Sequence, residues 1–380
     1  MLSTFLDAKP LFYEKIDYER MPRIYASIKE QLKLPKIIHL VGTNGKGTTG
    51  RFLATALFAT GHKVGHYTSP HIITFNERVW LNGALVSDVA LEDAHRALLL
   101  LLTPQDADAL SYFEYTTLLA IYLYQECDYL ILEAGLGGEY DATAVFKNIL
   151  TVVTPIDRDH EAFLGETIKE IASTKLNAIQ KRVVLAKQKH KTVYDIAEDL
   201  SSERGFELFR YETLLRRKDQ KNIEILRELH NLPLYLQENI SVSIAVLHLL
   251  NISYNVESFE KSRLYGRLSQ IAPNIIIDVG HNVLAANAIV SALKGKKFTL
   301  VFNSYKDKNY KEILSILRTI IEKVELIAID DARIESRVVM LETLESLAIP
   351  HTLFEAVSSD KNYLVFGSFS VVEAFLRQKN

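Results

Sequence analysis

The sequence predicts an α/β protein with two successive domains, each built on a mainly parallel sheet. Two observations support this fold class. Short apolar runs typical of buried strands alternate with longer segments in which apolar residues recur at helical spacing, as expected for strands joined by crossover helices. At 380 residues, the chain also exceeds the size that one hydrophobic core usually organises.

The first domain is expected to cover residues 1–264. Its strands are predicted at 37–41, 63–67, 129–133 and 149–153, with an edge strand or hairpin at 76–83. Its helices are predicted at 18–32, 51–59, 87–102, 111–125, 166–180 and 236–250, whereas 181–235 alternates strand-like and charged pieces. The second domain, 265–380, is a smaller, Rossmann-like α/β series with strands predicted at 274–278, 298–302, 324–329 and 363–366.

The composition is that of an ordinary soluble globular protein. Hydrophobic residues make up 48% and charged residues 24% of the chain, and the net charge of −3 provides no basic face for nucleic acid. The single cysteine, Cys127, cannot form an internal disulfide, which fits a reducing compartment. We see no secretion signal, and the longest aliphatic run, 97–102, is too short to span a bilayer. We expect a cytoplasmic monomer without nucleic-acid or membrane partners.

A glycine-rich loop at 42–47 connects the first predicted strand to a helix. Its glycines let backbone N–H groups converge on an anion, Lys46 can reach terminal phosphates, and Thr48 or Thr49 can bind Mg²⁺. The loop departs from the common P-loop pattern in two places. Leu40 replaces the first glycine, and Gly47 separates the lysine from the hydroxyls. The pattern favours a phosphate-binding P-loop over a tight turn with an incidental lysine.

Acidic and histidine residues follow two further strands of this domain. Glu133 ends an otherwise apolar strand just before the glycine cluster 134–138, and His160 lies in the segment after strand 149–153. Carboxyl ends of parallel strands are where such folds bind ligands, so a functional role is favoured for Glu133 over a capping or ion-paired one. For His160, a functional role and a hydrogen-bonded structural role are evenly weighted on the residue alone.

Sequence blocks spread along the chain resemble the folylpolyglutamate synthase/dihydrofolate synthase family of the Mur ligase superfamily. In order they are GTNGKGTT, YTSPH, NERVWLNG, SYFEYTTLLA, LEAGLGGEYDAT, DHEAFLGETIKEIASTK, YGRL, DVGHN and FGSF, from residue 42 to residue 369. Each block is weakly specific, but their common order makes coincidence implausible. The resemblance implies an ATP- and Mg²⁺-dependent ligase of folate biosynthesis and one-carbon metabolism. Such enzymes join L-glutamate to a pterin-linked carboxylate in a cleft between two domains.

The resemblance implies an ATP site and a metal site. Arg267 is expected to reach phosphate only when the domains close, although an interdomain salt bridge would also explain it, and Asp278 could equally be a strand-end carboxylate in a turn. The implied cofactors are ATP and Mg²⁺, with K⁺ or another monovalent cation as an option. The ATP contacts are Asn44, Gly45, Lys46, Gly47, Thr48, Asn239, Arg267 and Asp278, and the metal ligands are Ser69, Glu133 and His160.

Lys175 lies on a predicted helix, where the family carries a lysine converted by CO₂ to a carbamate. Carbamylation replaces a cation by an anion and needs a neutral amine, which burial can provide by lowering the lysine pKa. A solvated helix lysine is the ordinary alternative. This sequence also departs from the family at residues 176–177, where Leu-Asn replaces the usual Ala-Gly. We take Lys46, His160 and Lys175 as the candidate catalytic residues.

The resemblance also implies contacts to the pterin substrate and to glutamate. Aromatic side chains can face a flat heterocycle and carboxylates can accept its N–H donors, although aromatic residues at helical spacing more often pack in a core. The pterin contacts are Asp17, Tyr18, Glu19, Arg20, Ser111, Tyr112, Phe113, Glu114, Tyr140, Asp141 and Ala142, and the glutamate contacts are His281 and Ser368. His281 precedes Asn282, so a role at a helix start is also open.

The predicted reaction is the coupling of L-glutamate to dihydropteroate, to folates, or to both, through an acyl phosphate. Two other classes stay open on the sequence: another Mur-type amino-acid ligase, and a non-catalytic nucleotide-binding module. The sequence does not determine the acceptor, the number of glutamates added, or the modification of Lys175.

Overall fold

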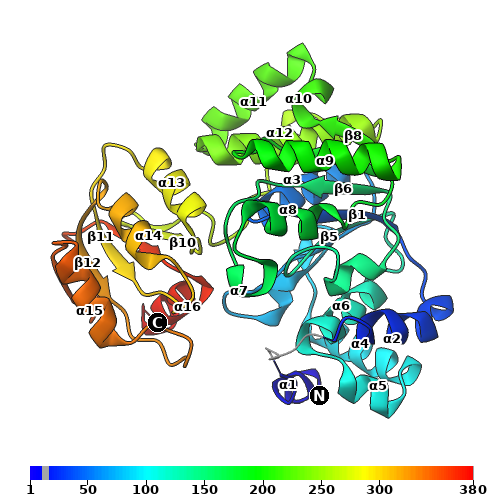
Figure 1. Cartoon of the computed structure of the whole chain (residues 1–380), viewed down its shortest axis with the longest axis horizontal. Helices are drawn as coiled ribbons and strands as arrows, with labels where there is room; N and C mark the ends of the chain where they lie inside the picture. The colour runs from blue at the N-terminus through cyan, green and yellow to red at the C-terminus, as the bar shows by residue number, and fades with distance from the viewer. Residues whose placement is uncertain (11–16, 380) are drawn as a thin grey trace.

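Two sheets, each formed by its own part of the chain, organise the structure (Figure 1). The computed structural model describes residues 1–10 and 17–379. The first sheet has eight strands in the order β4-β3-β2-β5-β1-β6-β7-β8, and the second has six in the order β13-β12-β11-β14-β10-β9. Neighbouring strands run parallel except at the β2-β3-β4 end and at the β10-β9 pair. The predicted fold class is confirmed.

The first domain comprises the eight-stranded sheet and its helices. The hairpin predicted at 76–83 is confirmed by the antiparallel pair β3 and β4, which turns at Asn82 and Gly83. The strands are β1 (Lys36–Val41), β2 (Val64–Tyr67), β3 (Val79–Leu81), β4 (Ala84–Leu85), β5 (Tyr129–Glu133), β6 (Leu150–Val153), β7 (Arg182–Leu185) and β8 (Glu207–Arg210). The helices are α1 (Leu2–Asp7), α2 (Arg20–Ile28), α3 (Lys46–Ala59), α4 (Asp88–Leu101), α5 (Pro104–Ala109), α6 (Tyr112–Leu123), α7 (Glu161–Leu164), α8 (Ile168–Leu176), α9 (Lys191–Arg204), α10 (Tyr211–Leu214), α11 (Arg217–His230) and α12 (Leu234–Leu249), with short 3₁₀ turns η1 (Lys29–Gln31), η2 (Phe75–Arg78), η3 (Ala142–Val145) and η4 (Val256–Phe259).

Both faces of this sheet are covered, which explains why its central strands are apolar throughout. Successive side chains of a strand point to opposite faces. Ile37 and Leu130 pack in the core with α2, α4 and α6, whereas their neighbours Ile38 and Ile131 pack on the other face with α3 and α12. Because α3 lies between the sheet and α12, it is buried on most sides. The loop that precedes α3 therefore has the sheet on one side and α12 on the other.

The second domain has strands β9 (Ser269–Ala272), β10 (Ile275–Asp278), β11 (Phe298–Phe302), β12 (Ile321–Leu326), β13 (His351–Leu353) and β14 (Tyr363–Phe366) and helices α13 (Val283–Ala292), α14 (Tyr310–Leu317), α15 (Arg337–Ser346) and α16 (Phe369–Lys379). Helices α13 to α15 cover one face of the sheet and α16 the other. The strand predicted at 324–329 was placed three residues too late in the chain, because β12 begins at Ile321 and ends at Leu326. Strands β9 and β13 were not predicted, because edge strands with partly exposed residues lack an apolar run.

The helix predicted at 166–180 is also shorter than expected. It begins after Thr167, whose hydroxyl accepts from the backbone N–H of Glu170, and ends at Leu176. Ala178 and Ile179 are apolar because they enter the core beside β7 as part of a turn, not because the helix continues. Among the described residues, no helix has the length and apolar character needed to cross a membrane.

Candidate active site between the two domains

A cavity of about 250 Å³ opens between the carboxyl ends of strands from both sheets. The first domain contributes the loop after β1, the end of β5, and residues of α8 and α12, and the second contributes the end of β10 and the segment before β9. The structure therefore brings together predicted residues that are far apart in sequence. Those lining the cavity are Asn44, Gly45, Lys46, Gly47, Thr48, Ser69, Glu133, His160, Lys175, Asn239, Arg267, Asp278 and His281.

The glycine-rich loop is fixed against α12. Gly45 precedes α3 with φ of 89°, a left-handed conformation that favours glycine, and a Cβ at this position would lie 2.9 Å from Oδ1 of Asn239. Asn239 Nδ2 donates a hydrogen bond of 2.6 Å to Oγ1 of Thr48. Asn239, a predicted ATP contact, is therefore in direct contact with the loop, and it fixes the first turn of α3.

Two lysines meet at one carbonyl of the loop. Lys46 Nζ and Lys175 Nζ each donate to the Gly42 carbonyl oxygen at 3.1 Å. Burial, with the nearby charge of Lys46, lowers the pKa of Lys175 to about 7. Gly138 permits this arrangement, because a Cβ there would lie 2.8 Å from the Lys175 backbone.

The structure changes two points about Lys175. It lies in the last turn of α8, and not in the interior of the helix predicted at 166–180. It is 4% exposed, which excludes the alternative of a solvated helix lysine. Of the two residues that depart from the family pattern, Leu176 is buried, whereas Asn177 donates to Glu139 at 2.8 Å.

Glu133 is a buried carboxylate at the end of β5. Burial raises its pKa above the usual value, and the positive charges of Lys46 and Arg267 oppose that shift only in part. Lys46 Nζ lies 3.9 Å away, and the Thr68 hydroxyl and the Ser69 backbone N–H donate to it. The neighbouring cations therefore stabilise the ionised carboxylate only in part, so a further cation in the cavity would stabilise it more.

On the opposite wall, Asp278 organises the second domain's contribution. Its two carboxylate oxygens accept backbone N–H bonds of 2.8 Å from Leu268 and Gly280, so it joins the turn before β9 to the turn after β10. Arg267 lies on the first of these turns, with its guanidinium 5.1 Å from the ring centre of Phe369. Asp278 is therefore the strand-end carboxylate in a turn that the sequence left open as an alternative. Through its bond to Leu268 it also positions Arg267.

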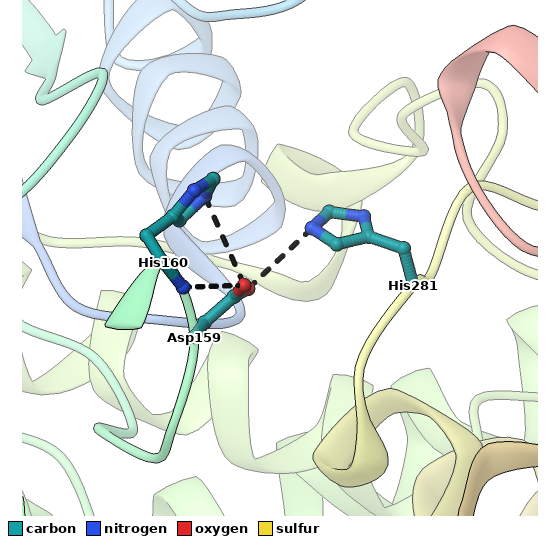
Figure 2. Close-up of side chains that lie close together, drawn as sticks. All are labelled: Asp159, His160 and His281. Atoms are coloured by element: carbon teal, nitrogen blue, oxygen red, sulfur yellow. Dashed lines mark hydrogen bonds and ion pairs between the residues drawn. The ribbon is translucent and has the colours of Figure 1, made fainter. Parts of the chain in front are cut away.

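Asp159, which the sequence analysis did not single out, lies between His160 and His281 (Figure 2). His281 Nε2 is 3.4 Å from Asp159 Oδ2, and His160 Nε2 is 3.9 Å from Oδ1. Lys308 Nζ and Asn282 Nδ2, both from the second domain, donate to the same carboxylate at 2.7 and 2.9 Å. Loss of hydration on burial lowers the pKa of His160 to about 4, so the ring is neutral near pH 7.

These contacts bear on the predicted metal ligands. Ligand atoms of Asp159, His160 and His281 lie within 4.8 Å of one another, close enough for a metal ion. Ser69, by contrast, contacts Glu133. Asp159 and Asn282 stood inside blocks that carried the family resemblance and could have been found there. Lys308 follows an exposed, charged turn and gave no sequence signal.

The predicted pterin contacts form a cluster outside the cavity lining. Arg20 Nε pairs with Glu114 Oε2 at 2.8 Å, and the rings of Tyr18 and Tyr140 lie 4.5 Å apart. The ring of Phe113 packs on Gly135, which does line the cavity, so the cluster adjoins it.

Several members of this set also have structural roles. Ser111 and Glu114 form the capping box of α6, and Asp141 accepts backbone bonds from Leu136 and Thr143 at the start of η3. Ser368 is buried and caps α16 by accepting from Val371 N, and it does not line the cavity.

Comparison with known proteins identifies the family. No protein-family model matches the chain. The dihydrofolate synthase/folylpolyglutamate synthase of Haemophilus influenzae is 32% identical over 92% of this chain and 91% of its own. The chain belongs to the dihydrofolate synthase/folylpolyglutamate synthase family. This confirms the predicted family and the predicted enzyme class, an ATP-dependent ligase.

Solved structures agree with this family. The crystal structure of Helicobacter pylori folylpolyglutamate synthetase has a TM-score of 0.81 and 37% identity, covering 99% of this chain and 97% of its own. The Yersinia pestis bifunctional folylpolyglutamate synthase/dihydrofolate synthase, complexed with AMPPNP and a Mn ion, has a TM-score of 0.81 and 25% identity, covering 99% and 96%. Family membership favours the ligase reading over the nucleotide-binding module.

Proposed function

We propose that this chain couples L-glutamate to the carboxylate of dihydropteroate, of a folate, or of both, with conversion of ATP to ADP and phosphate. One observation carries the proposal: Lys46 of the first domain and Arg267 of the second line the same cavity. A site that binds phosphate from both sides suits a reaction in which phosphoryl transfer activates a carboxylate. The names of the relatives supply the acceptor and the amino acid.

The chemistry has two steps. The acceptor carboxylate attacks the γ-phosphorus of ATP, the bond to the bridging oxygen breaks, and ADP leaves. The glutamate amine then attacks the acyl carbon, the C–O bond to phosphate breaks, and the amine loses a proton as the amide forms. Phosphoryl transfer needs mainly positioning and charge neutralisation. We assign these to Lys46 and the loop amides on one side and to Arg267 on the other, with Asn44, Thr48, Asn239 and Asp278 as further ATP contacts.

Mg²⁺ is the proposed divalent cation, with Ser69, Glu133 and His160 as its protein contacts. The buried carboxylate of Glu133 fits this role, because its neighbouring positive charges offset burial only in part. Imidazole is a less common Mg²⁺ ligand, and His160 already adjoins Asp159. When bound, the ion neutralises charge on the phosphate oxygens. Chelation by EDTA should abolish turnover and added Mg²⁺ should restore it. K⁺ stays a prediction that turnover with and without KCl tests.

Lys175 is the proposed site of a carbamate. A pKa of about 7 leaves a sizeable neutral fraction to react with CO₂ at physiological pH. A carbamate resonance in the ¹³C NMR spectrum with labelled bicarbonate, present in the wild type and absent in Lys175→Met, is the expected result. For the substrates, we propose the cluster around Tyr18 and Tyr140 for the pterin, and His281 for glutamate.

Four broader proposals accompany this function. We place the domain boundary at residues 264–265, between the last helix of the first domain and β9. We also propose a monomeric protein that acts in the cytoplasm, without nucleic-acid partners. Sedimentation analysis tests the monomeric state, cell fractionation tests the location, and a nucleic-acid binding assay tests the last proposal.

The direct test is an ADP-release assay with the purified protein. ADP should appear only when the pterin acceptor, L-glutamate, ATP and Mg²⁺ are all present. Release that ignores glutamate would contradict the proposal. Comparing dihydropteroate with tetrahydrofolate as acceptor then assigns the chain to dihydrofolate synthesis, to polyglutamate extension, or to both.

A further inference from the structure

We propose that Asp159 and Lys308 are a positioning pair that joins the two domains, so that Arg267 faces the glycine-rich loop across the cavity. The inference rests on the proposed function for its kinetic readout, but its structural readout does not.

The pair is short, buried and formed between domains. Lys308 Nζ lies 2.7 Å from Asp159 Oδ1, and both side chains are 7% exposed. Asp159 belongs to the segment between β6 and α7 of the first domain, and Lys308 to the turn between β11 and α14 of the second. A movement that separates the domains must therefore break this contact.

Asp159 collects further contacts from the second domain. His281 and Asn282, at the turn after β10, both approach its other oxygen, at 3.4 and 2.9 Å. One carboxylate of the first domain thus binds side chains from two separate turns of the second. Because two turns of the second domain are held by one carboxylate, the contacts restrain rotation of the domains relative to each other as well as their separation.

A second link carries this restraint to the phosphate-binding loop. Asn44 Nδ2 donates to Asn282 Oδ1 at 3.0 Å, and Asn282 Nδ2 donates to Asn44 Oδ1 at 2.8 Å. Asn282 also begins α13, where its side chain accepts from Ala285 N. The loop is therefore tied to the same turn that Asp159 holds, on the strand that carries Asp278.

The physics of a buried ion pair suits a positioning role. Removing Lys308 leaves the buried Asp159 carboxylate without its ammonium partner, which is more costly than losing an exposed salt bridge. Removing Asp159 costs less, because Lys308 keeps Asp307 at 3.3 Å. When the domains separate, water can solvate both charges instead. Lys308 also gives Asp159 a resident cation, which favours domain pairing over metal binding for this carboxylate, although it lies within ligand distance of two histidines.

The test compares Lys308→Met, Lys308→Arg, Asp159→Asn and the double variant Asp159→Asn/Lys308→Met. Lys306→Met is the matched control, because Lys306 is exposed on the same turn and its ammonium donates to the Ala332 carbonyl within the second domain. Steady-state kinetics give kcat and the KM for ATP and glutamate. Thermal melting reports folding, and small-angle scattering reports the separation of the domains.

We expect Lys308→Met to lower kcat/KM for glutamate by about 30-fold or more, the scale seen when one partner of a buried charge pair is removed. The double variant should lose no more than the worse single variant, Lys308→Arg should recover part of the loss, and Lys306→Met should match the wild type. Full activity in Lys308→Met, or losses that multiply in the double variant, would overturn the proposal.

Scattering separates this proposal from the proposed function. Lys308→Met should have a larger radius of gyration than the wild type, with an unchanged melting profile of the first domain. That result can be obtained even if the wild type fails to use a pterin acceptor. An unchanged radius of gyration would refute the positioning role whatever the reaction is.

Discussion

The two walls of the cavity are built in different ways. On the first-domain wall, Lys46 and Lys175 are both held by the carbonyl of Gly42, and Asn239 holds Thr48, so these contacts lie within one domain. Only Asn44 of this loop bonds to the second domain among the contacts described above, through Asn282. On the second-domain wall, Asp278 fixes the turn that carries Arg267, but the distance of that turn from the loop depends on contacts across the interface.

The difference shows which half of the site is ready before substrate binds. Groups held within one domain keep their geometry whatever the other domain does, so changing them removes an interaction without altering the cavity. Groups brought in by the second domain act only when the domains are close together. Changes there should affect both the chemical step and the apparent substrate affinity. The predictions below test this distinction, beginning with the largest effect.

Lys46→Met should produce the largest loss. Removing a positioned cation from a phosphoryl-transfer site is expected to lower kcat by roughly 10²- to 10³-fold. The melting temperature should change little, because Thr68, Ser69 and Arg267 still stabilise Glu133, and loss of the Lys46 charge relieves its repulsion with Lys175. ADP release and thermal melting check both points, with Lys169→Met on the exposed face of α8 as the control. Turnover within threefold of the wild type would exclude the phosphate-binding role.

Arg267→Lys should have a smaller but mixed effect. Lysine keeps the charge but loses the planar fork that binds two phosphate oxygens and stacks on Phe369, so we expect about a 10- to 100-fold fall in kcat/KM for ATP. Both kcat and KM should change, unlike in Lys46→Met. Arg227→Lys is the control, because Arg227 is exposed and pairs with Glu224 within α11. A change in KM alone would place Arg267 outside the transition-state contacts.

Lys175 should make stability depend on pH. Its folded-state pKa, about 7, is below the unfolded value of 10.5, so between these values the unfolded chain binds more protons than the folded one. Stability of the unmodified protein should therefore rise with pH across this window, relative to Lys175→Met. Melting temperatures of both proteins in CO₂-free buffers from pH 6.5 to 9.5 measure the effect. A constant difference between them would contradict the lowered pKa.

The sequence predicted those parts of the site whose determinants are local. Around the loop at 42–47, a strand, several glycines, a lysine and a helix follow one another within a few residues. Glu133 is the single charged residue at the end of an apolar strand. Lys308 could not be predicted in this way. Its role arises from the packing of two domains, and its partner lies 149 positions earlier in the chain.

The same reasoning explains the errors in the fold. Central strands such as β5 are buried on both faces and read clearly as apolar runs. Edge strand β13 has exposed or half-exposed residues only, so it carries no such pattern. The helix predicted at 166–180 was too long because Ile179 is buried in a turn, and apolar spacing alone cannot distinguish that from a further helical turn.

The smallest effect concerns the pterin cluster, which lies wholly within the first domain. A substitution there should therefore remove one interaction without altering the cavity, as expected for the first-domain wall. The rings of Tyr18 and Tyr140 are about half exposed and lie 4.5 Å apart, so they form an exposed aromatic surface. Tyr140→Leu should raise the KM for the pterin acceptor by about 2- to 12-fold, the equivalent of the 0.5–1.5 kcal/mol of an aromatic pair, with kcat unchanged. Phe163→Leu, at another exposed aromatic residue, is the control. The cluster reaches the cavity through Phe113 and Gly135, and none of the predicted pterin contacts lines the cavity itself. A loss in kcat for Tyr140→Leu would therefore mean that acceptor binding also drives domain closure. The first wall would then be less independent of the second than its contacts indicate.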